Sequence, residues 1–560
     1  MALFLSMICF VAYAQKTITG NVKDATGEPL IGATVSLGSG QGAVTDFDGN
    51  FTLQNVNTGA TLTISYVGCK TQQVKIGAAN SYNIVLQDDN SSLDEVVVIG
   101  YGTVKKRDLT GSVASVGHDA LTANPVSNVA EALQGKLAGV SVVSQDGRPG
   151  ASVSIKVRGG GSISQSNEPL FVVDGMPVND ISDIPADQIE SVDVLKDASS
   201  TAIYGARGAN GVILVTTKSA QEGKISVSYN GYFQAKWAAK TLDVLSAQDY
   251  VALQWAYTTA GGWNPGDIAR YFGLGSSNGN HYAEYANMKA HDYTQDMLRT
   301  ATGWNHNVSI SGGTEKTKVN FSANYVNDEG IKINSNFERL ALNLKLRQEL
   351  AKRLFFDMDL RYADMNIKGR DAVVSSRGSL LSSAFMYRPI DNPLGTDDYT
   401  LFGMGAGNID PNQNPVAITE TLYNLNQRNR LRGNFSLTWE PIKGLTLRTE
   451  YGVGRTWGQG KYYDDGSINS GFSFTKGHKY ASLSKNNGKN WRWVSTINYE
   501  VQGLGEDHSL SFLLGNEELK SSSETSRMYG GGFPNSDAWT MDRVFGMIHM
   551  GDATAYPAEN

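Results

Sequence analysis

The sequence predicts a mainly β protein in which an N-terminal β-sandwich and a mixed α/β domain precede an antiparallel transmembrane β-barrel. Three observations predict this fold. Short β-forming runs are separated by Gly, Asn and Asp turns up to residue 87, and apolar and polar residues alternate from residue 224 onward. Beyond the N-terminus, no segment reaches the roughly 18 consecutive apolar residues that a membrane helix requires. A chain without such helices still crosses a bilayer if its strands close into a barrel.

The composition limits the class of protein before any motif is considered. The chain has 560 residues, of which 61 are Gly and 40% are apolar, and its formal net charge is −7. This apolar fraction is too high for a disordered chain, and the length allows several domains. Because the charge balance is acidic and no long basic run occurs, we do not expect a nucleic-acid partner.

The first residues are typical of a secretion signal. Residues 2–12 form an apolar run, and Ala12, Tyr13 and Ala14 supply the small-x-small pattern before Gln15. We therefore expect a signal peptide at residues 1–14, with cleavage between Ala14 and Gln15. Cys69 is then the one remaining cysteine, which excludes a disulfide framework, and we expect it to be a small buried apolar residue.

Residues 15–87 are predicted to form a compact β-sandwich. Closely spaced turns separate six strand-like runs, TITGNV, ATVSL, GNFTLQNV, TLTISYV, QQVKI and YNIVL. Residues 45–50 resemble the start of a calcium loop but lack its closing Glu. We expect a plain turn there.

Residues 88–102 combine a polar spacer with a short strand-forming segment, DEVVVIGYG at 94–102. Its centre is β-branched, which favours an extended backbone. Such a segment either pairs within its own chain or adds as a strand to the sheet edge of another protein. The residues themselves leave both alternatives open.

Residues 103–222 are predicted to mix helices and strands. Helices are expected at 126–137 and around 187–196, with strands in VSVVS, VSIKVRG, PLFVVDG and VILVTT.

Candidate catalytic and metal sites were sought in this domain and along the whole chain. The Gly-rich run at 205–211 has the wrong spacing for a dinucleotide loop, the seven His show no ligand spacing, and no nucleophile motif occurs. For Asp174, Glu190 and Asp193 we expect turn and helix-surface roles instead of acid–base roles. Neither an enzyme nor a metal or other cofactor is therefore expected.

From residue 224 onward, about nine segments have one apolar and one polar face. Short connections alternate with long ones, the long ones including residues 367–427 and 455–489. Short turns on one side and long loops on the other are typical of outer-membrane barrels and rare in soluble sandwiches.

Four segments carry a resemblance to a known family. Residues 93–113 (LDEVVVIGYGTVKKRDLTGSV), 128–144, 154–180 and 189–218 resemble, in the same order, the SusC/RagA-type TonB-linked outer-membrane transporters. Residues 15–87 resemble the carboxypeptidase-regulatory-like domain that precedes the plug in many of these proteins. The resemblance implies a linker and TonB box at 88–102, a plug domain at 103–222 and the N-terminal part of the barrel at 223–560. The TonB box residues would be Asp94, Glu95, Val96, Val97, Val98, Ile99 and Gly100.

The resemblance also implies a function. The protein would import an oligosaccharide or oligopeptide across the outer membrane, driven by TonB with ExbB and ExbD, with a SusD-like lipoprotein as an extracellular lid. The barrel would lie in outer-membrane lipid, and the N-terminal domain and TonB box would be periplasmic. The alternatives are a siderophore or cobalamin receptor and a surface adhesin or signalling receptor without transport. Because a plugged barrel needs about 22 strands, we expect the chain to be the N-terminal portion of a longer protein.

Overall fold

Two units, Met1–Thr110 and Gly111–Asn560, make up the chain in the computed structural model, and each is described by itself. The structure describes residues 15–24, 27–37, 41–57, 59–66, 69, 71–77, 79–86, 96–99, 102–105, 113–144, 147–220, 222–260, 290–369, 381, 384–385, 387, 389, 414–466, 478–503, 508, 510–534 and 536–550.

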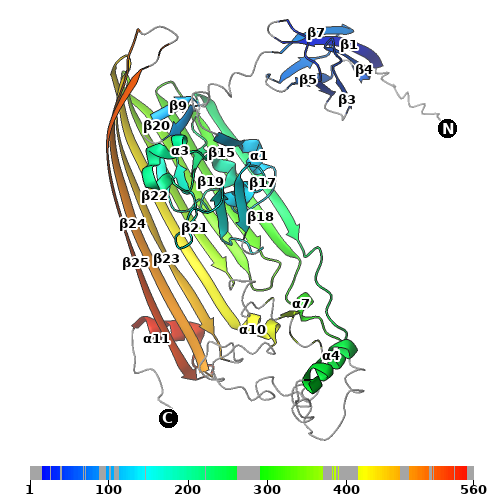
Figure 1. Cartoon of the computed structure of the whole chain (residues 1–560), viewed down its shortest axis with the longest axis vertical. Helices are drawn as coiled ribbons and strands as arrows, with labels where there is room; N and C mark the ends of the chain where they lie inside the picture. Colours follow the sequence, from blue (N-terminus) through cyan, green and yellow to red (C-terminus); the bar gives the residue numbers. More distant parts are fainter. Residues whose placement is uncertain are drawn as a thin grey trace, which may run out of the picture. The chain divides into compact units, whose positions relative to one another are not determined.

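The first unit is a β-sandwich of two sheets with the strand orders β4-β1-β7 and β3-β2-β5-β6 (Figure 1). Alternate residues of its strands, such as Phe51 and Leu53, face one apolar core. The seven strands are β1 (Gln15–Lys23), β2 (Thr34–Leu37), β3 (Gln41–Val44), β4 (Asn50–Asn57), β5 (Thr61–Ser65), β6 (Gln72–Lys75) and β7 (Ser81–Val85). The six expected runs are confirmed, whereas β3 lacked an alternating pattern that could have predicted it.

Two smaller expectations for this unit are settled by local contacts. Oδ1 of Asp46 accepts the backbone N–H groups of Asp48 and Asn50 at 3.0 and 2.8 Å, so residues 45–50 form the expected turn. Cys69 packs against the core but is only half-buried, so the expectation of full burial was wrong.

The second unit begins with an α/β domain. Its main sheet has the strand order β10-β15-β16-β13-β14, with β13 and β16 parallel, and β11 and β12 form a separate hairpin. Its elements are β10 (Val113–Gly117), α1 (His118–Thr122), α2 (Val129–Ala132), β11 (Val140–Ser144), β12 (Val153–Val157), β13 (Leu170–Val173), β14 (Met176–Val178), η3 (Ala186–Gln188), β15 (Ile189–Leu195), α3 (Ala198–Thr201), η4 (Ala202–Gly208) and β16 (Val212–Thr217).

Both helices expected in this domain need correction. Residues 187–196 form η3 and then β15, a central strand that is buried on both faces and therefore shows no clear period of two. Glu190 and Asp193 lie on this strand, not on a helix surface. The α-helix within 126–137 is limited to α2, because Gly135, at a φ of 72°, leaves the helical conformation.

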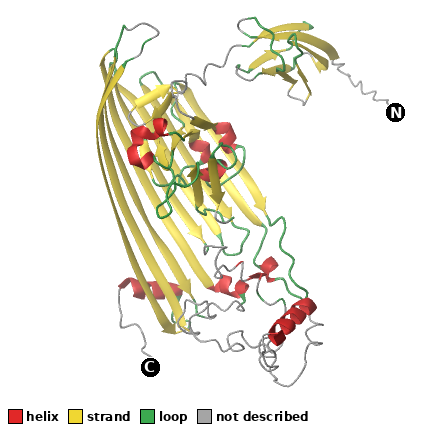
Figure 2. Ribbon diagram, viewed as in Figure 1, coloured by secondary structure: helices red, strands yellow, loops and turns green. Residues whose placement is uncertain are grey.

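A nine-stranded antiparallel sheet follows, with its strands in sequence order, and the α/β domain lies against one of its faces (Figure 2). The strands are β17 (Gly223–Lys236), β18 (Ala301–Gly313), β19 (Thr317–Glu329), β20 (Asn336–Ala351), β21 (Leu354–Lys368), β22 (Leu422–Ile442), β23 (Leu445–Asp464), β24 (His478–Glu500) and β25 (Ser511–Pro534). The helices between or after them are α4 (Ala247–Ala260), α7 (Tyr293–Asp296), α10 (Pro415–Thr421) and α11 (Met541–Met550).

The expected strand number is confirmed, and the expected alternation of connections holds except at 330–335, where a short connection joins β19 to β20. Short turns at 314–316, 352–353 and 443–444 lie at one end of the sheet, and α10 and α11 lie at the other (Figure 1). The long connection expected at 455–489 is shorter in the structure and covers 465–477. Backbone pairing continues β23 and β24 through residues whose sequence does not alternate between apolar and polar. The face away from the α/β domain exposes large apolar residues, including Trp304, Leu340, Trp439 and Trp493. Among the described helices, none has the length and apolar character needed to cross a membrane.

Candidate functional site

The segment predicted to bind TonB forms a local hairpin. β8 (Val96–Ile99) pairs antiparallel with β9 (Gly102–Lys105), with Val96 opposite Lys105 and Ile99 opposite Gly102. Asp94, Glu95 and Gly100 lie outside the described residues, as does Ala14 of the expected cleavage site, while Gln15 begins β1. Among the described residues β8 pairs with β9 alone, so its second edge has no strand beside it there. A two-stranded hairpin is only marginally stable by itself.

A second candidate site joins the α/β domain to the large sheet. Six basic side chains on one face of the sheet converge on residues 174–183 of the domain. We call these side chains the basic clamp: Arg339 and Lys345 of β20, Arg361 of β21, Arg430 and Arg432 of β22, and Arg492 of β24. Four strands of the sheet thus hold one ten-residue segment.

Asp174 is presented to the clamp by a tight turn. Asp174 and Gly175 join β13 to β14 with φ angles of 47° and 87°, the left-handed pair typical of an Asp-Gly hairpin turn. The carboxylate accepts hydrogen bonds from the backbone N–H and the hydroxyl of Thr217 at 2.9 and 2.7 Å. It also pairs with Lys345 at 3.2 Å and directly with Arg361. Burial alone raises the pKa of Asp174, but Lys345, Arg361 and Thr217 outweigh it and leave the pKa below the ordinary value. The turn expected for Asp174 is therefore present, with an ion-pairing role added.

Asp180 and Asp183 form the second group of ion pairs. Arg430 bridges them, with Nη2 at 2.6 Å from Asp180 and Nη1 at 2.9 Å from Asp183, and Nη1 of Arg432 lies 2.9 Å from Asp183. Burial raises the pKa of Asp180, but Arg430 and the hydrogen bonds from Ser182 have the larger opposite effect. The pKa of Asp180 is therefore lowered to about 2. The carboxylate of Asp180 therefore stays ionised at neutral pH.

The remaining clamp arginines bind backbone carbonyls. Nη1 of Arg339 donates to the carbonyls of Ser127 and Ser182 at 3.0 and 2.9 Å, and Nη1 of Arg492 donates to that of Gly175 at 3.2 Å. Glu450 and Glu517 balance the charge of Arg492 within the sheet. Carbonyl contacts of this kind fix the position of the segment and do not depend on its side chains.

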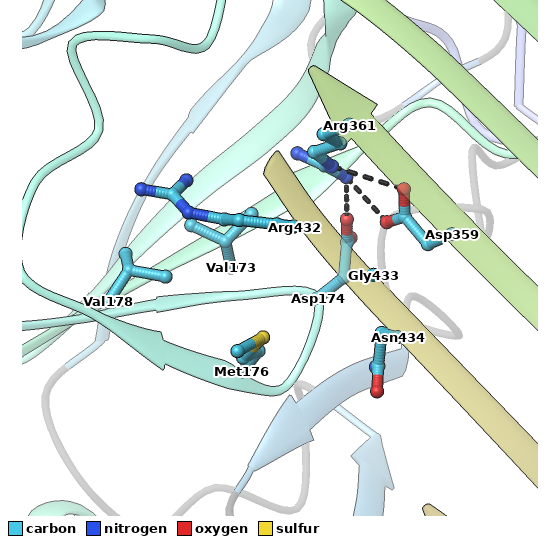
Figure 3. A pocket seen from close by; sticks show the side chains of 9 residues that line it. All are labelled: Val173, Asp174, Met176, Val178, Asp359, Arg361, Arg432, Gly433 and Asn434. Carbon is cyan, nitrogen blue, oxygen red and sulfur yellow. Dashed lines mark hydrogen bonds and ion pairs between the residues drawn. The ribbon is translucent and has the colours of Figure 1, made fainter. Parts of the chain in front are cut away.

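A small cavity lies inside this interface (Figure 3). Its walls are the β13–β14 hairpin on one side and β21 and β22 on the other, with the lining residues Val173, Asp174, Met176, Val178, Asp359, Arg361, Arg432, Gly433 and Asn434. The space is about 20 Å³, enough for about one water molecule. A space of this size is too small for a sugar or a peptide.

The apolar interiors of the domain and the sheet are separate. Among the described residues, the apolar cluster of the α/β domain contains only residues of that domain, from Ala114 to Val215. The cluster on the domain-facing side of the sheet, Val326, Phe337, Met365 and Ile367, contains only sheet residues. The two parts are therefore held mainly by ion pairs and hydrogen bonds.

Alternating arginines in the sequence of β22 indicate one part of the basic clamp. Residues 428–432, RNRLR, place Arg428, Arg430 and Arg432 on one face of β22. The alternation of apolar and polar residues predicted the polar faces of β20 and β21, but it did not predict which part of the chain these faces contact. The partners lie far away in the sequence, since Asp174 and Arg361 are 187 positions apart.

Comparisons with known proteins agree with this architecture. Residues 105–212 match the TonB-dependent Receptor Plug Domain, and residues 18–98 match the CarboxypepD_reg-like domain. The TonB-dependent receptor SusC of Bacteroides thetaiotaomicron is 34% identical over 96% of this chain and 52% of its own length. The TonB-dependent receptor P26 of Formosa agariphila is 35% identical over 92% of this chain and 50% of its own. The chain thus spans about half the length of the curated relatives it matches.

Solved structures give the same result. The RagAB peptide importer in its open-open state is 25% identical, with a TM-score of 0.67 over 80% of this chain and 51% of that one. Its closed-closed state gives 24% identity and a TM-score of 0.64 over 77% and 50%.

Proposed function

The chain belongs to the SusC/RagA-type TonB-dependent receptors, and from this premise we propose that it acts in TonB-dependent import of an oligosaccharide or oligopeptide across the outer membrane. The observation that carries the proposal is the separation of the two apolar interiors, with a polar clamp between them. A domain held by exchangeable polar contacts separates from its sheet without exposing an apolar core. The α/β domain, hereafter the plug, then closes the passage at rest and moves when it is pulled. The peptide cargo named for the RagAB importer supports the oligopeptide alternative.

TonB acts through residues 94–100 in this proposal. The free edge of β8 accepts a strand of TonB, or that strand replaces β9, whose hairpin with β8 is only marginally stable. Backbone hydrogen bonds along a paired strand carry a pull along the chain, whereas side-chain contacts give specificity. Energy comes from the proton-motive force through ExbB and ExbD.

The remaining parts take roles that follow from this mechanism. The apolar outer face of the sheet contacts outer-membrane lipid, and the N-terminal sandwich and residues 94–100 are periplasmic. A SusD-like lipoprotein covers the extracellular side. Residues 1–14 are removed after Ala14, and no catalysis or cofactor is involved.

Deletion of residues 94–99 in the chromosomal gene tests the function. Uptake of fluorescently labelled mixed oligosaccharides and tryptic casein peptides is measured in cells, together with their binding at the cell surface. We expect the deletion to abolish uptake and preserve binding. The matched control removes residues 87–92, six residues of the polar spacer, and keeps uptake. Uptake that survives the loss of 94–99 contradicts the proposal.

A further inference from the structure

A neutral polar surface faces the plug beside the basic clamp. Five buried side chains on β18 and β19 form it, and we call it the carboxamide surface: Asn305, Asn307, Asn320, Ser322 and Asn324. Each is at most 7% exposed. Arg339 connects this surface to the plug, because its Nη2 donates to Asn324 while its Nη1 donates to plug carbonyls. The carboxamide surface therefore lies on the plug side of the sheet.

One row of cross-strand partners shows how the character of the sheet changes. Ser322 of β19 is opposite Asn343 of β20, Asn343 is opposite Arg361 of β21, and Arg361 is opposite Arg432 of β22. Cross-strand partners share a face, so this row is neutral on β19 and β20 and cationic on β21 and β22. The plug is bound tightly at the cationic end.

The plug is held more weakly at the neutral side. Nδ2 of Asn230 on β17 donates to Asp187 of the plug at 2.8 Å, in a contact open to solvent. Glu131 of α2 lies near Asp328 of β19, and burial together with this like charge raises the pKa of Glu131, although Lys236 opposes the effect. Lys236 pairs directly with Asp328 within the sheet, so Glu131 faces a carboxylate that already has its partner and adds no attraction across this side of the interface.

The chemistry of the surface fits a polar, uncharged solute. Among the described residues, Oδ1 of Asn307 and Oδ1 of the adjoining Asn343 are buried and have no hydrogen-bond partner. A carboxamide both donates and accepts hydrogen bonds, so it matches hydroxyl groups and peptide amides equally well. The carboxamide surface carries no charge, so its contacts with a passing solute are neutral hydrogen bonds, which are weaker than hydrogen bonds to a charged group.

We propose that the carboxamide surface of β18 and β19 lines the route of a hydroxyl- or amide-rich solute past the plug, while residues 174–183 stay bound to the basic clamp. The plug then opens on one side and keeps its attachment on the other. This inference rests on the proposed import function and adds the location of the passage and the chemistry of its wall.

Thiol labelling of two matched serines tests the location. Ser322→Cys lies in the carboxamide surface and Ser436→Cys beside the clamp, and the native serines are 4% and 5% exposed. Both changes are made in chromosomal variants that also carry Cys9→Ala and Cys69→Ala. Cells supplied with mixed oligosaccharides and casein peptides are treated with a membrane-impermeant maleimide, with and without a protonophore.

We expect Ser322→Cys to be labelled in energised cells alone and Ser436→Cys to stay unlabelled in both conditions. Labelling of both positions in energised cells, of Ser436→Cys alone, or of neither overturns the proposal. If the unmodified protein shows no proton-motive-force-dependent uptake of the same probes, the proposed function itself has failed, and this is measured first.

Cross-linking gives a second, independent measurement. A short bifunctional thiol reagent joins Asn230→Cys to Asp187→Cys on the neutral side, or Met176→Cys to Gly452→Cys on the clamp side, where a Cβ on residue 452 lies 3.4 Å from the Met176 side chain. We expect the first cross-link to stop uptake, reduction to restore it, and the second cross-link to leave it unchanged. Loss of uptake with both cross-links, or with the second alone, overturns the proposal.

Discussion

Arg361 and Arg432 stand directly opposite each other on β21 and β22, on the face of the sheet that holds the plug. Like charges in this position destabilise a sheet. Here Asp359 and Asp174 neutralise Arg361, and Asp183 neutralises Arg432. Two of these three carboxylates belong to the plug. The plug therefore supplies the carboxylate that neutralises Arg432 and one of the two that neutralise Arg361.

Removal of one plug carboxylate should destabilise the protein, because arginines of the sheet then lose an ion-pair partner. In Asp183→Asn, both Arg430 and Arg432 lose a buried ion-pair partner, and we expect a loss of about 3–5 kcal/mol in stability, the usual cost of breaking a buried pair on one side. Thermal unfolding of the purified protein in detergent measures it. Asp119→Asn, an exposed carboxylate of α1, is the control and should have little effect. Equal melting temperatures for the two variants would show that the clamp contributes nothing.

The turn at Asp174 separates the effect of charge from that of the backbone. Asn tolerates a positive φ, whereas Ala does not, so Asp174→Asn keeps the turn and loses the ion pairs with Lys345 and Arg361. Asp174→Ala loses both and should be about 1 kcal/mol less stable than the Asn variant. The difference between their melting temperatures checks this. An Ala variant as stable as the Asn variant would indicate that the left-handed turn carries no strain.

A low pH should weaken the interface between the plug and the basic clamp. The pKa of Asp180 is about 2 in the folded protein, below the value of about 4 expected when unfolded. A lowered folded-state pKa stabilises the fold above the unfolded pKa, and this contribution is lost as the pH falls from about 4 to about 2. We expect the melting temperature to fall over that interval, and less steeply in Asp180→Asn. Identical profiles for wild type and variant would rule out this contribution from Asp180.

Close approach of the plug to the sheet depends on a glycine. Gly150 has a φ of 70°, and a Cβ there would lie 2.5 Å from the ring of Phe337 on β20. We expect Gly150→Ala to destabilise the protein by about 1–3 kcal/mol through overpacking and backbone strain. Gly147→Ala meets no atom within 4 Å and is the matched control. Thermal unfolding again provides the measurement, and a Gly150→Ala variant as stable as the control would argue against tight contact here.

Sequence patterns predicted the elements that have one apolar and one polar face. The nine strands of the large sheet alternate because one face is apolar and the other meets the plug, so counting them from sequence succeeded. β15 was mistaken for a helix because both of its faces are buried, which removes the period of two. The outer parts of β23 and β24 were missed because pairing with neighbours, not apolar residues, continues them.

The basic clamp was beyond sequence reasoning for a different reason. Its charges were visible as polar positions on strands, but an ion pair depends on which residues meet. The register of β20 to β24 and the docking of residues 174–183 bring together groups such as Arg430 and Asp180, which are 250 positions apart. The interpretation of residues 94–100 as the TonB box stays a prediction, supported by the hairpin of β8 and β9 and by the family.

Energy coupling is the central claim, and uptake in cells with and without TonB tests it most directly. Fluorescently labelled mixed oligosaccharides and tryptic casein peptides are supplied to the source bacterium and to a strain that lacks TonB. Surface-bound and internalised label are counted separately. We predict that both strains bind the probes, that only the strain with TonB internalises them, and that a protonophore abolishes the difference. Equal internalisation in the two strains would contradict TonB-dependent import by this protein.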